Sequence, residues 1–223
     1  MHPHLTWPWL FLIILPPVVA AGLLGLLSLS GARSRDGVPR PILSTVAILG
    51  PALAFAAAVW ALVVLAGHQT VSTAAVVELM QGEDLRQQQM RQAAQPALVQ
   101  TLWTWFEAGG LTVRLGLLGD ALSLFMAVMV TGISTLITWY STGYMAHDRG
   151  LGRFLALVNL FVGMMLILVL ADSLPVTFLG WEGVGVCSWL LIGFWQHDPA
   201  NTAAGRKAFI VNRVGDLGFV LGM

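Results

Sequence analysis

Apolar stretches long enough to cross a membrane recur along this chain, and they constrain its fold more than any single motif does. A helix needs about 20 apolar residues to span the hydrocarbon core of a bilayer. We identify such stretches at 9–29, 42–66, 121–140, 154–171 and 174–195, and a sixth that starts near Lys207. Hydrophobic residues make up 57% of the chain and charged residues 10%, which is typical of a membrane protein. We therefore predict an all-α membrane protein, a transmembrane bundle of about six helices.

The spacing of these stretches divides the chain into three parts. Residues 1–66 hold the first two helices, 67–120 form a long connection, and 121–223 hold helices three to six. The alternating sequence after Gly109-Gly110 predicts a small extracytoplasmic hairpin in the connection. The sixth stretch reaches Met223 after about 16 residues. Because a helix cannot stop inside a bilayer with its last carbonyls unpaired, we expect this chain to be the N-terminal part of something longer.

Basic residues gather in the short connections, which all lie on one side of the predicted membrane. Three arginines occur in 31–40, two occur in 144–153, and Arg206 and Lys207 precede the sixth stretch. Short basic connections stay on the cytoplasmic side, so we predict that the N-terminus and the connection 67–120 are extracytoplasmic. The 11 basic and 11 acidic residues cancel, which gives no indication of nucleic-acid binding.

Glu182 lies inside the fifth apolar stretch, about eight residues from its start at Leu174. At about 1.5 Å per residue this places Glu182 roughly 12 Å into the membrane. An acidic residue there costs roughly 2.5–3.5 kcal/mol, so such residues usually face a protein interior and mark an ion or proton pathway. Gly180, Gly183 and Gly185 permit close helix packing and leave room for water. We predict a proton-titrating site, with a structural carboxylate locked to a base as the alternative.

The sixth stretch carries Lys207, Arg213 and Asp216. Arg213 and Asp216 are three residues apart and share one helix face, which favours a structural ion pair. Lys207 and Asp216 are nine residues apart, or about 180° around a helix, so they face different neighbours. Lys207 is either a proton carrier or an anchor that reaches the membrane surface.

Other polar residues predict structural roles. Asp120 stands at the start of a predicted helix and is explained by capping or solvation. Asn159 favours a hydrogen bond between helices. Cys187, the one cysteine, is expected to be a buried core residue. The sequence has no cysteine cluster and no glycine-rich dinucleotide motif in a strand–helix context, so we expect no catalytic, cofactor-binding or metal-binding residue here.

The strings FLGWEGVGVCSWLLIGFW (178–195) and DPANTAAGRKAFIVNRVGDLGF (198–219) closely resemble the subunit L family of NADH:quinone oxidoreductase, respiratory complex I. The resemblance is strong over roughly residues 100–223, while 1–100 agree only in the pattern of segments. Related cation/proton antiporter subunits tend to carry a Trp-Glu-Leu-Thr-Ser string where this chain has WEGVG. This departure favours complex I.

The resemblance implies a proton-translocating subunit of a bacterial inner membrane that carries no redox centre. NAD, FMN, iron–sulfur clusters and quinone would be held by partner subunits of the complex. Glu182, Lys207, Arg213 and Asp216 match family positions near the proton route. In the family, the glutamate at the position of Glu182 pairs with a lysine on the seventh helix, which lies outside this chain.

Two alternatives to a redox-driven pump remain open from the sequence. A subunit of a secondary cation/proton antiporter would exchange sodium or potassium for protons without an electron donor. A structural membrane anchor would need Glu182 only for assembly.

Overall fold

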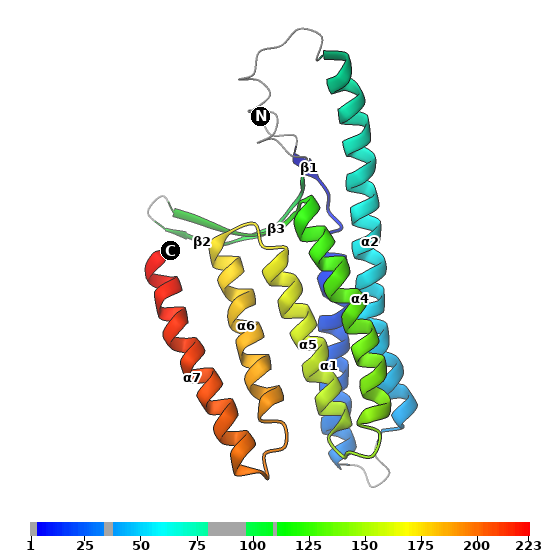
Figure 1. The fold of residues 1–223 in the computed structure, drawn as a ribbon, viewed down its shortest axis with the longest axis vertical. Coiled ribbons are helices and arrows are strands. Elements are labelled where there is room, and N and C mark those ends of the chain that lie inside the picture. The colour runs from blue at the N-terminus through cyan, green and yellow to red at the C-terminus, as the bar shows by residue number, and fades with distance from the viewer. Residues whose placement is uncertain (1–3, 34–37, 80–96, 109–110) are drawn as a thin grey trace.

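The computed structural model describes residues 4–33, 38–79, 97–108 and 111–223. Long helices dominate this part of the chain and stand side by side (Figure 1). They are α1 (Phe11–Arg33), α2 (Arg40–Leu79), α4 (Ala121–Tyr144), α5 (Leu151–Val169), α6 (Leu174–Ile192) and α7 (Pro199–Gly222). The strands β1 (His4–Thr6), β2 (Ala97–Ala108) and β3 (Leu111–Gly119) form a sheet at one end of the bundle. The predicted helical membrane bundle is confirmed.

Among the described residues, five helices are long and apolar enough to cross a membrane, namely α1, α2, α4, α5 and α6. We predicted a sixth span, and α7 is indeed a helix of 24 residues. Helix α7 is less apolar than the other five helices, because it carries the charged residues Arg206, Lys207, Arg213 and Asp216. A sixth span therefore stays a prediction.

Helix α2 continues without a break from Arg40 to Leu79, past the start of the connection predicted at 67–120. The length of an apolar stretch indicates where the hydrocarbon ends, whereas a helix can continue into the polar layer as long as its residues favour it. The candidate membrane span within α2 ends at Gly67, and the predicted boundary at residue 66 stays a prediction. The Gln-rich part of the connection, 80–96, lies outside the described residues.

Strands β2 and β3 pair antiparallel where the hairpin was predicted. Leu98 lies opposite Gly119 at one end of the pairing, and Ala108 lies opposite Leu111 at the other. Gly109 and Gly110, the predicted turn, lie outside the described residues. Strand β1 also joins the sheet, where it pairs parallel to the start of β2. The sequence did not indicate this strand. The indoles of Trp103 and Trp105 are more than half exposed, as a position at a membrane surface requires.

The main buried core is formed largely by α1, α2, α4 and α5. Helix α1 packs against α2 and α5, and α2 packs against α4. Asn159 of α5 is fully buried here and donates from Nδ2 to the carbonyl oxygen of Ala47 in α2, at 3.2 Å. This contact confirms the predicted interhelical hydrogen bond.

Helices α6 and α7 flank this group on the far side of α5 (Figure 1). The α4–α5 and α6–α7 connections lie together with the ends of α1 and α2 at the end of the bundle opposite the sheet. The basic connections at 144–153 and before α7 therefore share one end, as the alternation of spans predicted.

Candidate functional site

Two glycines of α6 bring this helix into close contact with α5. A Cβ atom on Gly180 would lie 2.6 Å from the backbone nitrogen of Leu168, and one on Gly183 would lie 2.5 Å from the sulfur of Met164. Nothing would lie within 4 Å of a Cβ on Gly185. The predicted close packing is therefore confirmed for Gly180 and Gly183. Because these two face α5, the neighbouring Trp181 and Glu182 are turned toward α7.

Helix α7 runs antiparallel to α6, and their side chains meet in successive layers. Near the sheet the rings of Phe178 and Phe219 stack with centroids 5.4 Å apart. Toward the opposite end Trp189 packs on Phe209, with centroids 5.3 Å apart. The charged residues lie between these two aromatic layers, so the aromatic contacts fix the height at which α6 and α7 present them to each other.

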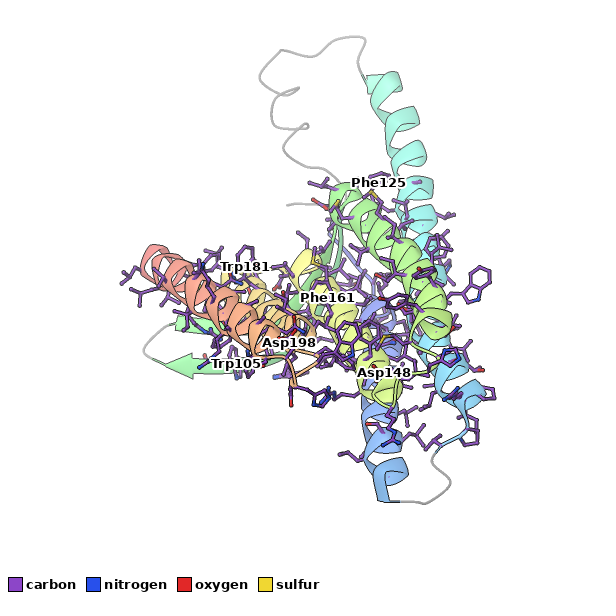
Figure 2. The ribbon with its side chains drawn as sticks, turned by 60° about the horizontal axis from the view of Figure 1, so that its bottom comes forward. Trp105, Phe125, Asp148, Phe161, Trp181 and Asp198 are labelled. Atoms are coloured by element: carbon purple, nitrogen blue, oxygen red, sulfur yellow. The ribbon has the colours of Figure 1, made fainter. Side chains whose placement is uncertain are left out.

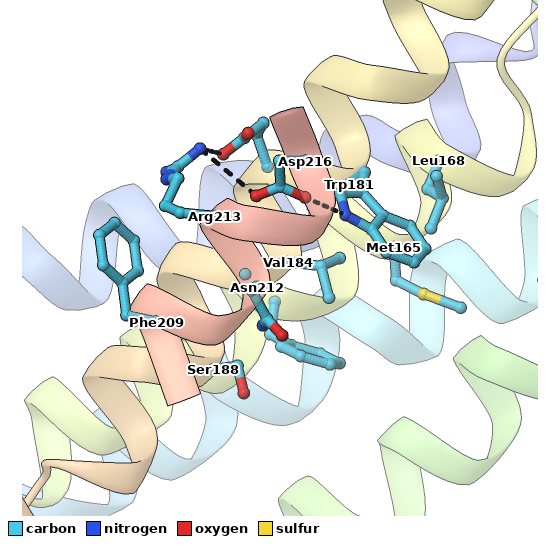
Figure 3. Close-up of a pocket in the computed structure, with 12 residues that line it drawn as sticks. Met165, Leu168, Trp181, Val184, Ser188, Phe209, Asn212, Arg213 and Asp216 are labelled. Carbon is cyan, nitrogen blue, oxygen red and sulfur yellow. Dashed lines mark hydrogen bonds and ion pairs between the residues drawn. The ribbon is translucent and has the colours of Figure 1, made fainter. Parts of the chain in front are cut away.

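The charged residues form one connected network. The Arg213 guanidinium donates from Nη1 to Oε2 of Glu182 in a close ion pair. The same Nη1 lies 3.6 Å from Oδ2 of Asp216. The indole nitrogen of Trp181 donates to the other oxygen of Asp216, Oδ1, at 2.8 Å. Arg213 therefore lies between the carboxylates of Glu182 and Asp216. The indole of Trp181 binds the Asp216 oxygen that does not face Arg213 (Figure 3).

This network lines a cavity of about 430 Å³ between α5, α6 and α7. The α5 side is apolar and is formed by Phe161, Met165 and Leu168. The other walls carry the polar side chains of Glu182, Ser188, Asn212, Arg213 and Asp216. A cavity of this size with several hydrogen-bonding groups can hold water. Water held there would lie beside both carboxylates.

Burial differs sharply among the predicted site residues. Asp216 is buried, with 8% of its surface exposed, and the Glu182 side chain is 19% exposed. Lys207 is exposed, and no ion pair or hydrogen bond to it occurs within the described residues. The prediction that Lys207 and Asp216 face different neighbours is confirmed. The predicted Arg213–Asp216 pair is present, but Glu182 is the closer partner of Arg213.

Two contributors to the site were not predicted from the sequence. Trp181 supplies the hydrogen bond to Asp216, and Phe209 lies under the guanidinium of Arg213, with 4.8 Å from Cζ to the ring centroid. The sequence carried a signal for the first, because an indole N–H in a membrane segment needs an acceptor. Phe209 precedes Arg213 by one helical turn, which is the spacing at which side chains meet.

A second network of the same side-chain types lies at the end opposite the sheet. The indole of Trp195 donates to Oδ2 of Asp148 at 2.9 Å, and the Gly150 amide donates to Oδ1 at 2.6 Å. Arg153 donates to the carbonyl oxygen of Phe194 at 2.7 Å and lies over its ring. These contacts join the α4–α5 and α6–α7 connections, on which Figure 2 labels Asp148 and Asp198.

The hydrogen bond from Trp195 holds the pKa of Asp148 below its usual range. The amide of Gly150 acts in the same direction, as do the positive charges of Arg153 and His197, while partial burial opposes them. Each donor stabilises the ionised carboxylate, which makes it harder to protonate.

Comparison with known sequences covers the part of the chain that holds both networks. Residues 105–155 match the N-terminal family of NADH-ubiquinone oxidoreductase (complex I) chain 5. Residues 171–223 match the transmembrane family of NADH:quinone oxidoreductase and Mrp antiporters. The chain belongs to the antiporter-like subunit family of NADH:quinone oxidoreductase.

Individual relatives agree with this family. The chain is 47% identical over 133 residues, 60% of its length, to NADH-quinone oxidoreductase subunit L of Mycobacterium tuberculosis. It is 46% identical over 151 residues, 68% of its length, to the subunit L of Escherichia coli K12. It is 47% identical over 122 residues, 55% of its length, to NADH-ubiquinone oxidoreductase chain 5 of Metridium senile.

The matched part of this chain spans only about a quarter or less of these relatives, 21%, 24% and 20% of their lengths. The predicted family is confirmed, and the chain is a multi-pass membrane protein.

Proposed function

We propose that this chain is a proton-translocating membrane subunit of NADH:quinone oxidoreductase. The observation that carries the proposal is the sharing of Arg213 between Glu182 and Asp216 beside a cavity with polar walls. Glu182, Arg213 and Asp216 would form the proton-coupled part of the route. Lys207 would lie on the approach to it from the connection before α7.

The network offers a physical means of coupling a proton to a movement of charge. While Glu182 is ionised, it attracts Arg213 directly. Once a proton neutralises Glu182, the attraction falls and the guanidinium is drawn toward Asp216, whose Oδ2 is already 3.6 Å away. In surroundings of low dielectric constant such attractions are strong, so one proton can shift the position of a whole cation. A shift of this kind can be passed to neighbouring helices.

The redox reaction would belong to partner subunits, which would hold NAD, FMN, iron–sulfur clusters and quinone. This chain would act as a translocase subunit with no redox centre of its own, together with the other membrane subunits of the complex. We place it in a bacterial inner membrane with the N-terminus and the sheet extracytoplasmic. The basic connections at the opposite end of the bundle support this orientation.

The direct test is Glu182→Gln in the native gene, which keeps the shape of the side chain and removes its titration. NADH-driven acidification of inverted membrane vesicles is recorded together with quinone reduction and subunit content. We expect acidification to fall at unchanged subunit content. Glu107→Gln, the same exchange on an exposed residue of β2, is the matched control and should leave acidification unchanged. Normal acidification in Glu182→Gln would make Glu182 a structural carboxylate.

A secondary cation/proton antiporter subunit is the second candidate, since the family that matches residues 171–223 includes Mrp antiporters. It predicts proton exchange that depends on sodium or potassium in vesicles without an electron donor. The match of residues 105–155 to a complex I family supports the first candidate over this one.

A further inference from the structure

We propose that Trp181 is a positioning residue that determines how Arg213 is divided between Glu182 and Asp216. This inference rests on the proposed function. The indole nitrogen of Trp181 donates to Oδ1 of Asp216 at 2.8 Å, across the α6–α7 interface. The bond leaves Oδ2 as the oxygen that faces Arg213, at 3.6 Å (Figure 3).

The hydrogen bond fixes the orientation of a side chain that would otherwise be free to turn. A carboxylate that loses one of its donors can rotate and present both oxygens to an arginine, which is the favoured geometry for such a pair. Asp216 and Arg213 are three residues apart on one helix, so they are within reach of each other. The indole of Trp181 prevents that arrangement by holding Oδ1 on the α6 side.

The consequence concerns Glu182. With Asp216 held at 3.6 Å, the guanidinium makes its close contact with Glu182. If Asp216 turned to bind Arg213 with both oxygens, the guanidinium would be drawn away from Glu182. Trp181 therefore keeps Arg213 available to Glu182 through its hydrogen bond to Asp216.

The indole is held in place by its polar contact more than by burial. Trp181 is 51% exposed, whereas the adjacent Gly180 is pressed against the backbone of Leu168. The helix backbone at this point is therefore fixed, and the ring reaches from it to Asp216. Inside a membrane, neither an indole N–H nor a carboxylate finds water readily, so each stabilises the other.

No other titratable group enters the network within the described residues. The α5 wall of the cavity contributes Phe161, Met165 and Leu168, none of which can carry a charge. Lys207 does not line the cavity. The charge balance at the site is thus set by Glu182, Arg213 and Asp216, and Trp181 is the neutral donor among them.

The experiment removes the N–H group while keeping the packing. Trp181 is replaced by 3-benzothienylalanine, in which sulfur takes the place of the indole N–H, and in parallel by phenylalanine. Trp139→Phe is the matched control, because Trp139 lies on α4, outside the α6–α7 interface, and is 66% exposed. The variants are made in the complete native gene, and NADH-driven acidification per quinone reduced is measured in inverted vesicles at equal subunit content.

We expect acidification to fall in both Trp181 variants and to stay unchanged in Trp139→Phe. A hydrogen bond to a charged group changes an equilibrium by about tenfold or more, so a loss of about threefold or greater should be seen. The pH profile of acidification should also be displaced along the pH axis. A packing defect lowers the whole profile without displacing it.

Two results would overturn the inference, namely normal acidification in the benzothienylalanine variant, or a profile that is lowered but not displaced. Glu182→Gln is measured alongside to separate this inference from the proposed function. If Glu182→Gln lowers acidification and the Trp181 variants do not, only the role of Trp181 is wrong. If Glu182→Gln has no effect, the proposed function itself is wrong.

Discussion

The molecule contains two networks built from the same parts, an indole, an aspartate and an arginine, in two different surroundings. In the interior network, Trp181 binds Asp216, and Arg213 pairs with Glu182 and Asp216, between α6 and α7. In the loop-end network, Trp195 binds Asp148, while Arg153 binds a backbone carbonyl and a phenylalanine ring. The interior network has two carboxylates and one arginine, whereas the loop-end network has one carboxylate and one arginine.

The comparison shows how the same side-chain types take different roles in different surroundings. The loop-end network is outside the membrane-spanning segments, where water screens its charges, so it serves to hold two connections together. The interior network lies between α6, a candidate membrane span, and α7, and its two carboxylates share one arginine. Under the proposed function, its surroundings screen these charges weakly. Under the proposed function, gain or loss of one proton rearranges the interior network. The loop-end network stays in one arrangement near neutral pH, because its hydrogen bonds keep Asp148 ionised.

The largest effect is expected when the arginines are removed. Arg213→Leu leaves two carboxylates without their cation and should destabilise the membrane subunit by about 3 kcal/mol or more. Arg153→Leu, the matched change at the loop end, removes one hydrogen bond and should cost about 1 kcal/mol. Subunit content in membranes and thermal unfolding in detergent measure both. Equal losses in the two variants would remove the distinction between the networks.

The next effect concerns the packing that presents the interior network. Gly180→Ala places a methyl group 2.6 Å from the Leu168 backbone nitrogen and should cost about 1–3 kcal/mol through overpacking. Gly185→Ala meets nothing within 4 Å and should be close to neutral. We expect Gly180→Ala to lower both the unfolding temperature and the acidification of vesicles. If both glycines tolerate alanine equally, the register of α6 on α5 does not position Trp181 and Glu182.

A smaller effect is expected from acid at the loop end. The pKa of Asp148 is lower in the folded protein than in the unfolded chain. Its contacts therefore stabilise the fold above an unfolded pKa of about 4, and this contribution is lost as the pH falls through the folded value. Asp148→Asn should weaken the acid dependence of thermal unfolding in this range while leaving acidification of vesicles near neutral pH unchanged. Asp198→Asn, on the neighbouring connection, is the control, and an unchanged acid dependence in Asp148→Asn would contradict the assignment.

The smallest effect is expected from Lys207→Gln. The side chain is exposed, and surface substitutions of this kind usually change stability by less than about 0.5 kcal/mol. Unchanged acidification would identify Lys207 as an anchor at the membrane surface. A clear loss at normal subunit content would instead identify it as a proton carrier and would extend the interior network toward the α6–α7 connection.

The sequence by itself determined the parts that depend on neighbouring residues. Apolar stretches located the helices α1, α2, α4, α5 and α6, because the bilayer sets the length that a spanning helix needs. Asp120 was expected at a helix end, and its side chain accepts a hydrogen bond from the Ser123 amide at 2.7 Å in a capping box. The three-residue spacing of Arg213 and Asp216 placed them on one face. Such features follow from the pitch of a helix and from its unpaired ends.

Only the tertiary structure decided which groups meet across helices. The partner of Glu182 within this chain is Arg213, 31 residues away, and Trp181 reaches Asp216 over 35 residues. Their meeting depends on the rotation of α6, which is set by the contact of Gly180 and Gly183 with α5, and on the height of α7, which is set by aromatic layers. Helical periodicity gives the face of a residue but not the neighbour that the face will meet, because that neighbour is chosen by the packing of whole helices.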